Sequence, residues 1–118
     1  MSKDLSVSVL MDFYQELLTE KQREALELYY NQDYSLAEIA QHMDISRQGV
    51  RDFIKRGEQS LLEFEDALAV AKRFGEMNRS IEQLRVLFAK MREASQAPVV
   101  QRCLDEAEKL VSDMEQNA

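Results

Sequence analysis

Apolar side chains recur every three or four residues along most of the 118-residue chain, which is the spacing of one helix face. Glu, Gln, Leu, Ala, Met and Arg dominate the sequence and favour helix, whereas Val, Ile and Thr are sparse. Pattern and composition together predict an all-α fold. The first predicted helix carries the apolar positions Leu10, Phe13, Tyr14, Leu17 and Leu18.

Two capping boxes mark the starts of the next two helices. In each, a hydroxyl caps the first turn and a side chain three residues later reaches back to the cap. Residues 19–22 have the sequence Thr-Glu-Lys-Gln, and residues 35–38 have the sequence Ser-Leu-Ala-Glu. The first box predicts a helix to about Asn31, and the second predicts a short helix to about Met43.

The spacing after the second capping box is typical of a helix-turn-helix. Such a motif needs a small residue where its helices cross, and Ala40 takes that place, five residues before Ile45 and ten before Val50. Asp44 stands in the turn where glycine is common, and Asp tolerates a left-handed backbone better than most residues. Ser46 caps the second helix. The predicted buried residues of the motif are Leu36, Ile39, Ala40, Met43, Ile45, Val50 and Ile54.

If Val50 and Ile54 face inward, helical rotation turns a polar face of this helix outward. Gln can pair with adenine and Arg with guanine in the major groove, while Arg47, Lys55 and Arg56 could hold phosphates. Asp52 could accept a hydrogen bond from cytosine, or pair with Lys55 or Arg56 one turn away. The predicted DNA-binding residues are Arg47, Gln48, Arg51, Asp52, Lys55, Arg56 and Gln59.

The charge distribution separates this helix from the rest of the chain. The net charge of −7 by itself argues against a nucleic-acid ligand. Residues 47–56 nevertheless carry four positive side chains and one negative, a net +3, so the remainder of the chain carries −10. Positive charge confined to one short segment is what a single recognition helix would show.

Roughly residues 10–75 resemble two groups of bacterial proteins. Residues 18–23 (Leu-Thr-Glu-Lys-Gln-Arg), with residues 34–40 and 45–48, are similar to sigma factor region 4, which reads promoter −35 elements. Residues 12–22 and 46–50 resemble more closely the YlxM family of small helix-turn-helix proteins. That resemblance implies a regulator whose gene usually neighbours that of the signal recognition particle GTPase, and a role in that secretion pathway.

The rest of the sequence predicts long helices. The second helix of the motif can continue well past Ile54 to Gly75, the first plausible stop. A break at Pro98 then separates two heptad tracks, which could zip as an antiparallel hairpin or pair with another chain. We expect a helix-turn-helix domain at 1–75 and a helical hairpin or dimerisation extension at 76–118. The tracks are Met77, Ile81, Leu84, Phe88 and Met91, and Val100, Cys103, Ala107, Leu110 and Met114.

Both heptad tracks form apolar stripes that are wider than a contact between two helices requires. Such width indicates a second surface to be covered. We expect a homodimer formed through the C-terminal helices, which would also present two motifs to a two-fold DNA site. The hairpin could alternatively fold back onto residues 10–30 of the same chain. The residues that widen the tracks are Val86, Leu87, Val99, Leu104 and Val111.

The composition argues against several other functions. No apolar run approaches the ~20 residues of a membrane span, and the N-terminus lacks a signal-peptide pattern, so we expect a cytoplasmic protein without membrane insertion. Cys103, the single cysteine, is expected to pack as a small hydrophobe, and His42 has no second ligand nearby for a metal. Neither a phosphate loop nor a Ser/His/Asp set occurs, so we expect no enzyme activity and no cofactor.

Two functions fit this sequence. The first is a DNA-binding regulatory protein, which needs an unobstructed outer face at residues 47–59. The second is a protein- or RNA-interaction factor of the signal recognition particle that uses the helix-turn-helix as a docking surface. The −10 charge outside the motif favours the second, because it would repel nucleic acid at long range.

Overall fold

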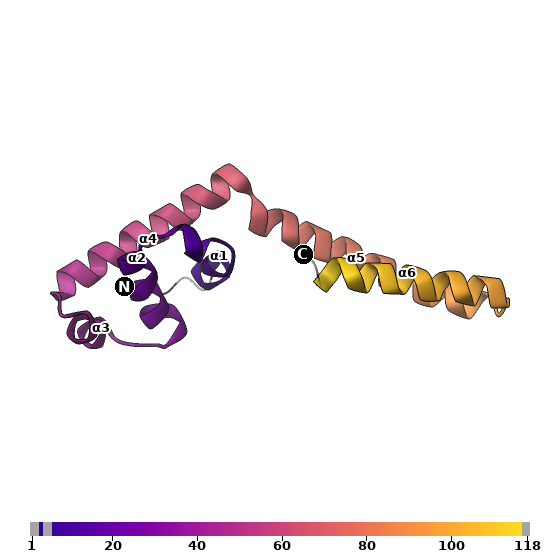
Figure 1. Ribbon diagram of the computed structural model, residues 1–118, viewed down its shortest axis with the longest axis horizontal. Helices are drawn as coiled ribbons and strands as arrows, with labels where there is room; N and C mark the ends of the chain where they lie inside the picture. The colour runs from indigo at the N-terminus through magenta and orange to yellow at the C-terminus, as the bar shows by residue number, and fades with distance from the viewer. Residues whose placement is uncertain (1–2, 4–5, 117–118) are drawn as a thin grey trace. The chain divides into compact units, whose positions relative to one another are not determined.

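The computed structural model describes residues 3 and 6–116, and every element in that part of the chain is helical (Figure 1). The predicted all-α fold is confirmed. The chain forms two compact units, one up to Ala71 and one from Lys72 onward. In chain order the elements are α1 (Ser6–Tyr14), the 3-10 helix η1 (Gln15–Leu17), α2 (Glu20–Leu26), the π-helical turn η2 (Glu27–Asn31), α3 (Leu36–Met43), α4 (Arg47–Leu68), α5 (Val70–Ala94) and α6 (Pro98–Gln116).

Side-chain caps start α2 and α3 where the sequence predicts them. Thr19 Oγ1 accepts a hydrogen bond from the backbone amide of Gln22 at 3.2 Å, and Gln22 Oε1 accepts one from the backbone amide of Thr19 at 3.3 Å. Ser35 and Glu38 form the same reciprocal pair, with distances of 3.1 and 3.0 Å. Both capping boxes are therefore confirmed, and each satisfies two amides that the start of a helix leaves without backbone partners.

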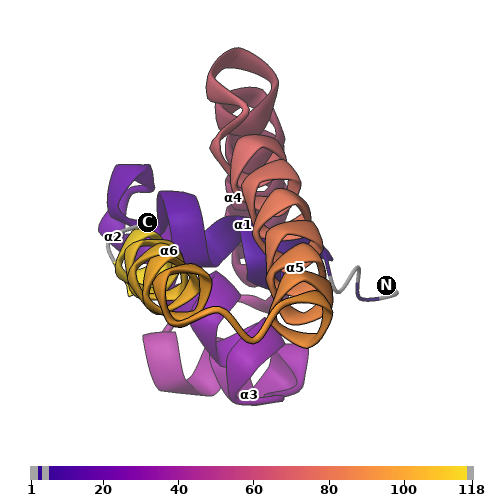
Figure 2. The same cartoon turned by 90° about the vertical axis from the view of Figure 1, so that its right-hand side faces the viewer.

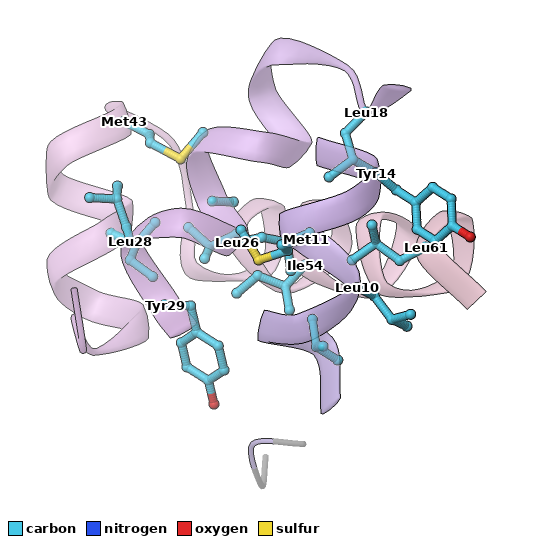
Figure 3. Packing of buried hydrophobic residues seen from close by; sticks show 14 residues of the cluster. Leu10, Met11, Tyr14, Leu18, Leu26, Leu28, Tyr29, Met43, Ile54 and Leu61 are labelled. Atoms are coloured by element: carbon cyan, nitrogen blue, oxygen red, sulfur yellow. The ribbon is translucent and has the colours of Figure 1, made fainter. Parts of the chain in front are cut away.

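The core of the N-terminal unit lies among α1, α2, α3 and α4. Leu26, Ile54 and Leu61 are fully buried at its centre, and Met11 of α1 lies beside them (Figure 3). Leu17, which we expected on the apolar face of the first helix, is instead 55 % exposed. The reason is that α1 gives way to η1, whose tighter turn advances each side chain by more than an α-helix does.

Helix α4 ends earlier than the sequence predicts. We expected the stop at Gly75, but α4 ends at Leu68 and Gly75 lies inside α5. Ala69 adopts the left-handed conformation with φ of 54°, which interrupts the helical path, and its amide still donates to the Glu65 carbonyl at 2.8 Å. A left-handed residue is a common helix terminator, although glycine is the usual choice.

Side chains distant in sequence hold this break in place. The Tyr14 hydroxyl donates to Glu65 Oε1 at 2.6 Å and accepts from the Val70 amide at 2.9 Å. Glu65 Oε1 also accepts from the Ala71 amide at 3.0 Å. The first amides of α5 are therefore capped by side chains from α1 and α4. Since Tyr14 and Glu65 are 51 residues apart, local sequence pattern does not reveal this cap.

In the C-terminal unit, α5 and α6 lie side by side and run in opposite directions (Figures 1 and 2). The buried side chains of this hairpin are Ile81, Leu104 and Val111. The predicted track on α6 is wrong. Leu104 and Val111, which we placed beside the track, face α5 instead, so the helix is rotated about its axis relative to the prediction. Cys103, which we expected to be packed, is exposed, and Leu110 is 65 % exposed.

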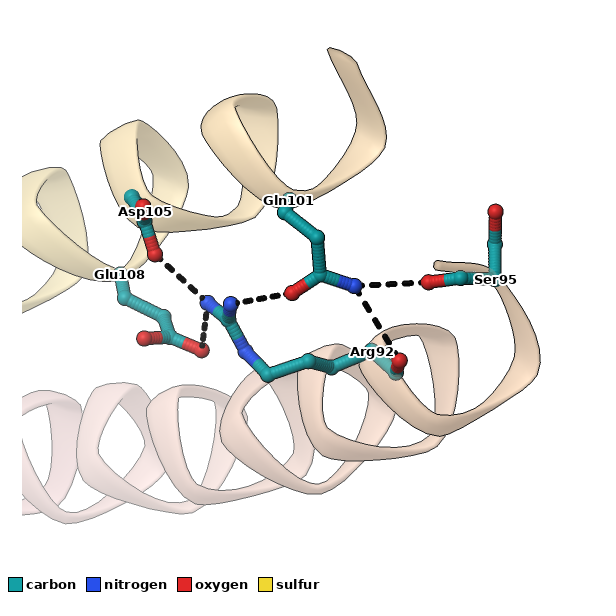
Figure 4. Close-up of polar contacts among 5 residues, drawn as sticks. All are labelled: Arg92, Ser95, Gln101, Asp105 and Glu108. Carbon is teal, nitrogen blue, oxygen red and sulfur yellow. Dashed lines mark hydrogen bonds and ion pairs between the residues drawn. The ribbon is translucent and has the colours of Figure 1, made fainter. Parts of the chain in front are cut away.

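A polar network along one side of the hairpin explains this rotation (Figure 4). The Arg92 guanidinium lies 3.0 Å from Asp105 Oδ1 and 3.1 Å from Glu108 Oε1, and it donates to Gln101 Oε1 at 2.7 Å. The Gln101 amide group in turn donates to the Ser95 carbonyl at 2.6 Å. These contacts are possible only when α6 turns Gln101 and Glu108 toward α5, which brings Leu104 and Val111 into the seam.

Candidate nucleic-acid interface

A tight turn joins α3 to α4. Asp44 adopts the left-handed conformation with φ of 55°, as its tolerance for that region predicts, and the Ile45 amide donates to the Ala40 carbonyl at 3.0 Å. Ser46 Oγ then accepts from the Gly49 amide at 3.0 Å, which caps α4 as expected. These bonds fix the direction in which α4 leaves α3.

The inner face of the motif agrees with the sequence prediction. Val50, Ile54 and Ile39 are 0 % exposed, and Met43 is 9 % exposed. The remaining predicted members, Leu36, Ala40 and Ile45, are half-buried and pack against this cluster. The helix-turn-helix core is therefore confirmed, and it fixes which side of α4 faces outward.

The predicted DNA-binding residues spread over the exposed surface of α4, with Arg47 and Arg56, nine residues apart, on opposite sides of the helix. With Val50 and Ile54 inside, the polar side chains of the first half of the helix are turned away from the core. All seven are exposed: Arg47, Gln48, Arg51, Asp52, Lys55, Arg56 and Gln59. Neighbouring members lie one helical turn apart, so one ligand surface could contact several of them at once.

The basic side chains of this face are available to a ligand. Within the described part of the chain, no ion pair engages Arg47, Arg51, Lys55 or Arg56. Asp52, which we thought could pair with Lys55 or Arg56, instead accepts a hydrogen bond from Gln48 Nε2 at 3.1 Å. The carboxylate therefore lies within a face that is otherwise positive.

The positive character ends midway along α4. Gln59 Nε2 donates to Glu63 Oε1 at 3.1 Å, and exposed Asp66 follows one turn later. The second half of the exposed face is therefore acidic. A polyanion would be attracted to the N-terminal half of α4 and repelled by the C-terminal half, which limits the contact to residues 47–59.

Two residues that the sequence analysis did not single out as a pair hold α4 in position. The Tyr30 hydroxyl donates to Glu58 Oε1 at 2.5 Å, which ties η2 to α4. The Tyr30 ring also packs edge-on against Tyr29, with 5.2 Å between ring centroids. Glu58 is thereby tied to η2. The adjacent tyrosines were a signal of a contact here, but the partner lies 28 residues away.

Other kinds of site find no support among the described residues. No described helix has the length and apolar content to cross a membrane. Within the same residues, no cluster of His, Cys, Asp and Glu is arranged to hold a metal ion. His42 is exposed, and its Nε2 lies 3.7 Å from Glu24 Oε1.

Comparison with known proteins agrees with this architecture. A family model described as "Putative helix-turn-helix protein, YlxM / p13 like" matches residues 1–98. A UPF0122 protein of Thermoanaerobacter sp. (strain X514) is 40 % identical over 110 residues, covering 93 % of this chain and 94 % of the relative. A UPF0122 protein of Halalkalibacterium halodurans is 41 % identical over 108 residues (92 % and 99 %), and one of Acetivibrio thermocellus is 49 % identical over 86 residues (72 % and 74 %). The chain belongs to the UPF0122 family of YlxM/p13-like helix-turn-helix proteins.

Proposed function

We propose that this protein is a DNA-binding regulatory protein that places the first half of α4 in the major groove. One observation carries the proposal: an exposed helix face and the chain's confined positive charge coincide at residues 47–59. A major groove about 12 Å wide admits a helix, and the second helix of this motif class enters it with its N-terminal residues. The opposite side of α4 is buried, so this face is the one the motif can offer.

The residues divide by the contacts their chemistry allows. Gln48 and Arg51 would meet base edges, since their amide and guanidinium groups match adenine and guanine. Arg47, Lys55 and Arg56 would hold phosphates and fix the register of the helix on the duplex. Asp52 and Gln59 complete the face, and Asp52 would discriminate between bases more than it would add affinity.

Fluorescence anisotropy with a labelled DNA duplex over a salt series tests the proposal. Four neutralised phosphates would give a log–log salt slope of about −4. Arg51→Ala combined with Lys55→Ala should weaken binding and bring the slope about two closer to zero. The matched control is Arg102→Ala with Lys109→Ala, which removes two exposed positive charges from α6 and should leave binding unchanged. Binding that persists unaltered in the first double variant at high salt would refute the assignment.

The charge outside the motif supports a second function. The −10 carried outside residues 47–56 disfavours long-range attraction to nucleic acid. We propose, as that second function, a cytoplasmic interaction factor of the signal recognition particle, with the helix-turn-helix as its docking surface. The YlxM resemblance supports it. Pull-down from native lysate with and without nuclease separates the cases, because particle components retained after nuclease indicate a protein contact.

In either function we propose that the protein acts as a homodimer. The support is the exposed apolar surface of the C-terminal unit, where Leu87 is 52 % exposed, Met91 51 % and Leu110 65 %. Two copies would present two α4 faces to a two-fold DNA site.

A further inference from the structure

The α5–α6 hairpin has one polar side and one apolar side. The polar side carries the Arg92 network of Figure 4 and, further along, the ion pair between Arg85 and Glu115. On both helices the next row of side chains on the other side of the seam is apolar. We call this surface the apolar flank; it consists of Met77, Leu84, Leu87 and Met91 of α5 and Val100, Cys103, Ala107, Leu110 and Met114 of α6.

The rows of the apolar flank repeat every seven residues. Met77, Leu84 and Met91 form one row on α5, and Cys103 and Leu110 belong to one row on α6. Seven-residue rows stay on one side of a helix along its length, which is how helices of a bundle present their packing faces. The two helices contribute to one surface, since Met91 and Cys103 line the same shallow groove.

A second copy of this chain is the occupant that this pattern fits. Two such hairpins stacked flank to flank would form a four-helix bundle, in which every helix has apolar rows on two adjacent sides. The hairpin supplies both: a seam row through Ile81 and Leu104, and the flank row beside it. A two-fold interface is self-complementary, and the same residues of both copies would be covered at once. We propose that the apolar flank is the homodimer interface.

Charges along the outer edge of the apolar flank determine which helix of the second copy packs against which helix of the first. The edge row on α5 contains Glu76, Gln83 and Lys90, with Lys90 nearest the turn into α6, whereas the edge row on α6 contains Val99, Glu106 and Asp113. No ion pair within the described residues engages Lys90, Glu106 or Asp113. Packing α6 against α6 would bring the acidic rows together, which costs energy.

Packing α5 of one copy against α6 of the other avoids that repulsion. The contact of Arg92 with Asp105 shows that this end of α5 lies level with the first turns of α6. Lys90 of one copy would therefore meet Glu106 of the second. This inference deepens the homodimer of the proposed function, but its interface does not involve the α4 face.

Sedimentation equilibrium of the full chain at micromolar concentration tests the interface. Wild-type protein should be dimeric. Leu87→Gln with Leu110→Gln should raise the dimer dissociation constant by roughly 100-fold or more, because the two-fold axis places each change in the interface twice. Leu62→Gln is the matched control: Leu62 is similarly exposed at 54 % but belongs to α4, outside the hairpin, and its change should leave the dimer intact. A monomeric wild type, or equal effects of the two sets of substitutions, would overturn the proposal.

A charge exchange tests the orientation independently. Lys90→Glu should weaken the dimer about tenfold, and adding Glu106→Lys should restore it, because the pair is re-formed with reversed charges. No restoration in the double variant would overturn the α5-to-α6 arrangement.

Cys103 reports directly on whether the flank is covered. In the single chain this thiol is exposed, and no other cysteine competes with it for a thiol reagent. Its reaction rate should fall as protein concentration rises in wild type, and should not depend on concentration in Leu87→Gln/Leu110→Gln. A dimer whose thiol stays fully reactive would place the contact elsewhere and overturn the proposal. These measurements contain no DNA, so a monomer that binds DNA refutes only the interface, and a dimer that binds none refutes only the proposed function.

Discussion

Gly57 of α4 lies so close to Leu26 of α2 that a methyl group on Gly57 would approach Leu26 Cδ1 to 2.6 Å and Cγ to 3.2 Å. Leu26 is 0 % exposed, so it has no open space into which to turn. The glycine therefore sets the distance at which α4 crosses α2. Its conformational freedom is not used, because Gly57 sits inside a regular helix.

Gly57→Ala should lower the free energy of unfolding. Alanine in a helix interior gains about 0.5–1 kcal/mol over glycine, but overpacking a full core costs about 1–3 kcal/mol. We expect a net loss of about 1 kcal/mol in urea denaturation. Gly75→Ala is the control, because a methyl group there meets only Arg79 Nη1 at 3.8 Å and should stabilise α5. If Gly57→Ala were as stabilising as Gly75→Ala, the crossing would not be tight.

The helix-turn-helix could be predicted because its determinants are local. The capping boxes at residues 19–22 and 35–38 bond within one turn of helix, and Asp44 supplies the left-handed turn without any distant partner. The exposed or buried side of α4 then follows from the position of Val50 and Ile54. Gly57 was also visible in the sequence, but only the structure shows that Leu26 is what it makes room for.

Ala69→Gly should stabilise the protein. Ala69 holds a φ of 54° and ψ of 33°, a region that costs an L-residue about 1–2 kcal/mol and glycine very little. The greater entropy of glycine in the unfolded chain offsets part of this gain. We therefore expect a net increase of about 0.5–1 kcal/mol in the free energy of unfolding. Ala67→Gly, two residues earlier in regular α4, should instead lower it. A loss of stability in Ala69→Gly would mean that the left-handed conformation is not maintained in solution.

Tyr14→Phe should destabilise the end of α4 and the start of α5. The change removes the hydroxyl that donates to Glu65 and accepts from the Val70 amide, and so leaves that amide without its cap. Urea denaturation should show a lower midpoint. A second phenol-to-phenyl change, Tyr34→Phe on a half-buried side chain, provides the comparison and should have the smaller effect.

The same tyrosine should give the protein an alkaline limit. Burial, then the hydrogen bond to Glu65 and its negative charge, raise the pKa of Tyr14 above its ordinary 10.0, while the bond from the Val70 amide opposes this. A raised folded pKa means that the stabilisation is fully present below about pH 10 and is lost as pH rises through the folded value. The stability difference between wild type and Tyr14→Phe should therefore shrink above pH 10. A difference that stays constant across that range would contradict the assignment.

The sequence does not predict features for which two alternative packing faces of a helix are equally apolar. On α6, a track through Cys103 and Leu110 and a track through Leu104 and Val111 are both apolar, and periodicity ranks neither above the other. The choice is made by Arg92, whose partners on α6 lie up to 16 residues away. The end of α4 at Ala69 is likewise hidden from local sequence pattern, because Tyr14, which caps the Val70 amide, lies 56 residues away in the chain.

Asp52→Asn should tighten binding to DNA and steepen its salt dependence. Asp52 is exposed in the middle of the basic face and is bonded to Gln48 through one carboxylate oxygen, which an asparagine amide oxygen can replace. The change therefore keeps the local geometry but removes one negative charge from among Arg51, Lys55 and Arg56. We expect affinity for a random-sequence duplex to rise several-fold at physiological salt, with a salt slope about one unit steeper.

Asp66→Asn makes the same change of charge further along α4. The two positions are about 21 Å apart at 1.5 Å per residue, more than two Debye lengths at physiological salt, so this control should leave binding nearly unchanged. Anisotropy titrations of both variants at two salt concentrations show whether the effect depends on the position of the removed charge. Equal gains from the two substitutions would show that DNA senses only the net charge of the chain, and the assignment of the α4 face would fail. A gain confined to Asp52→Asn would locate the phosphates at residues 47–59, because only there is the removed charge within screening distance.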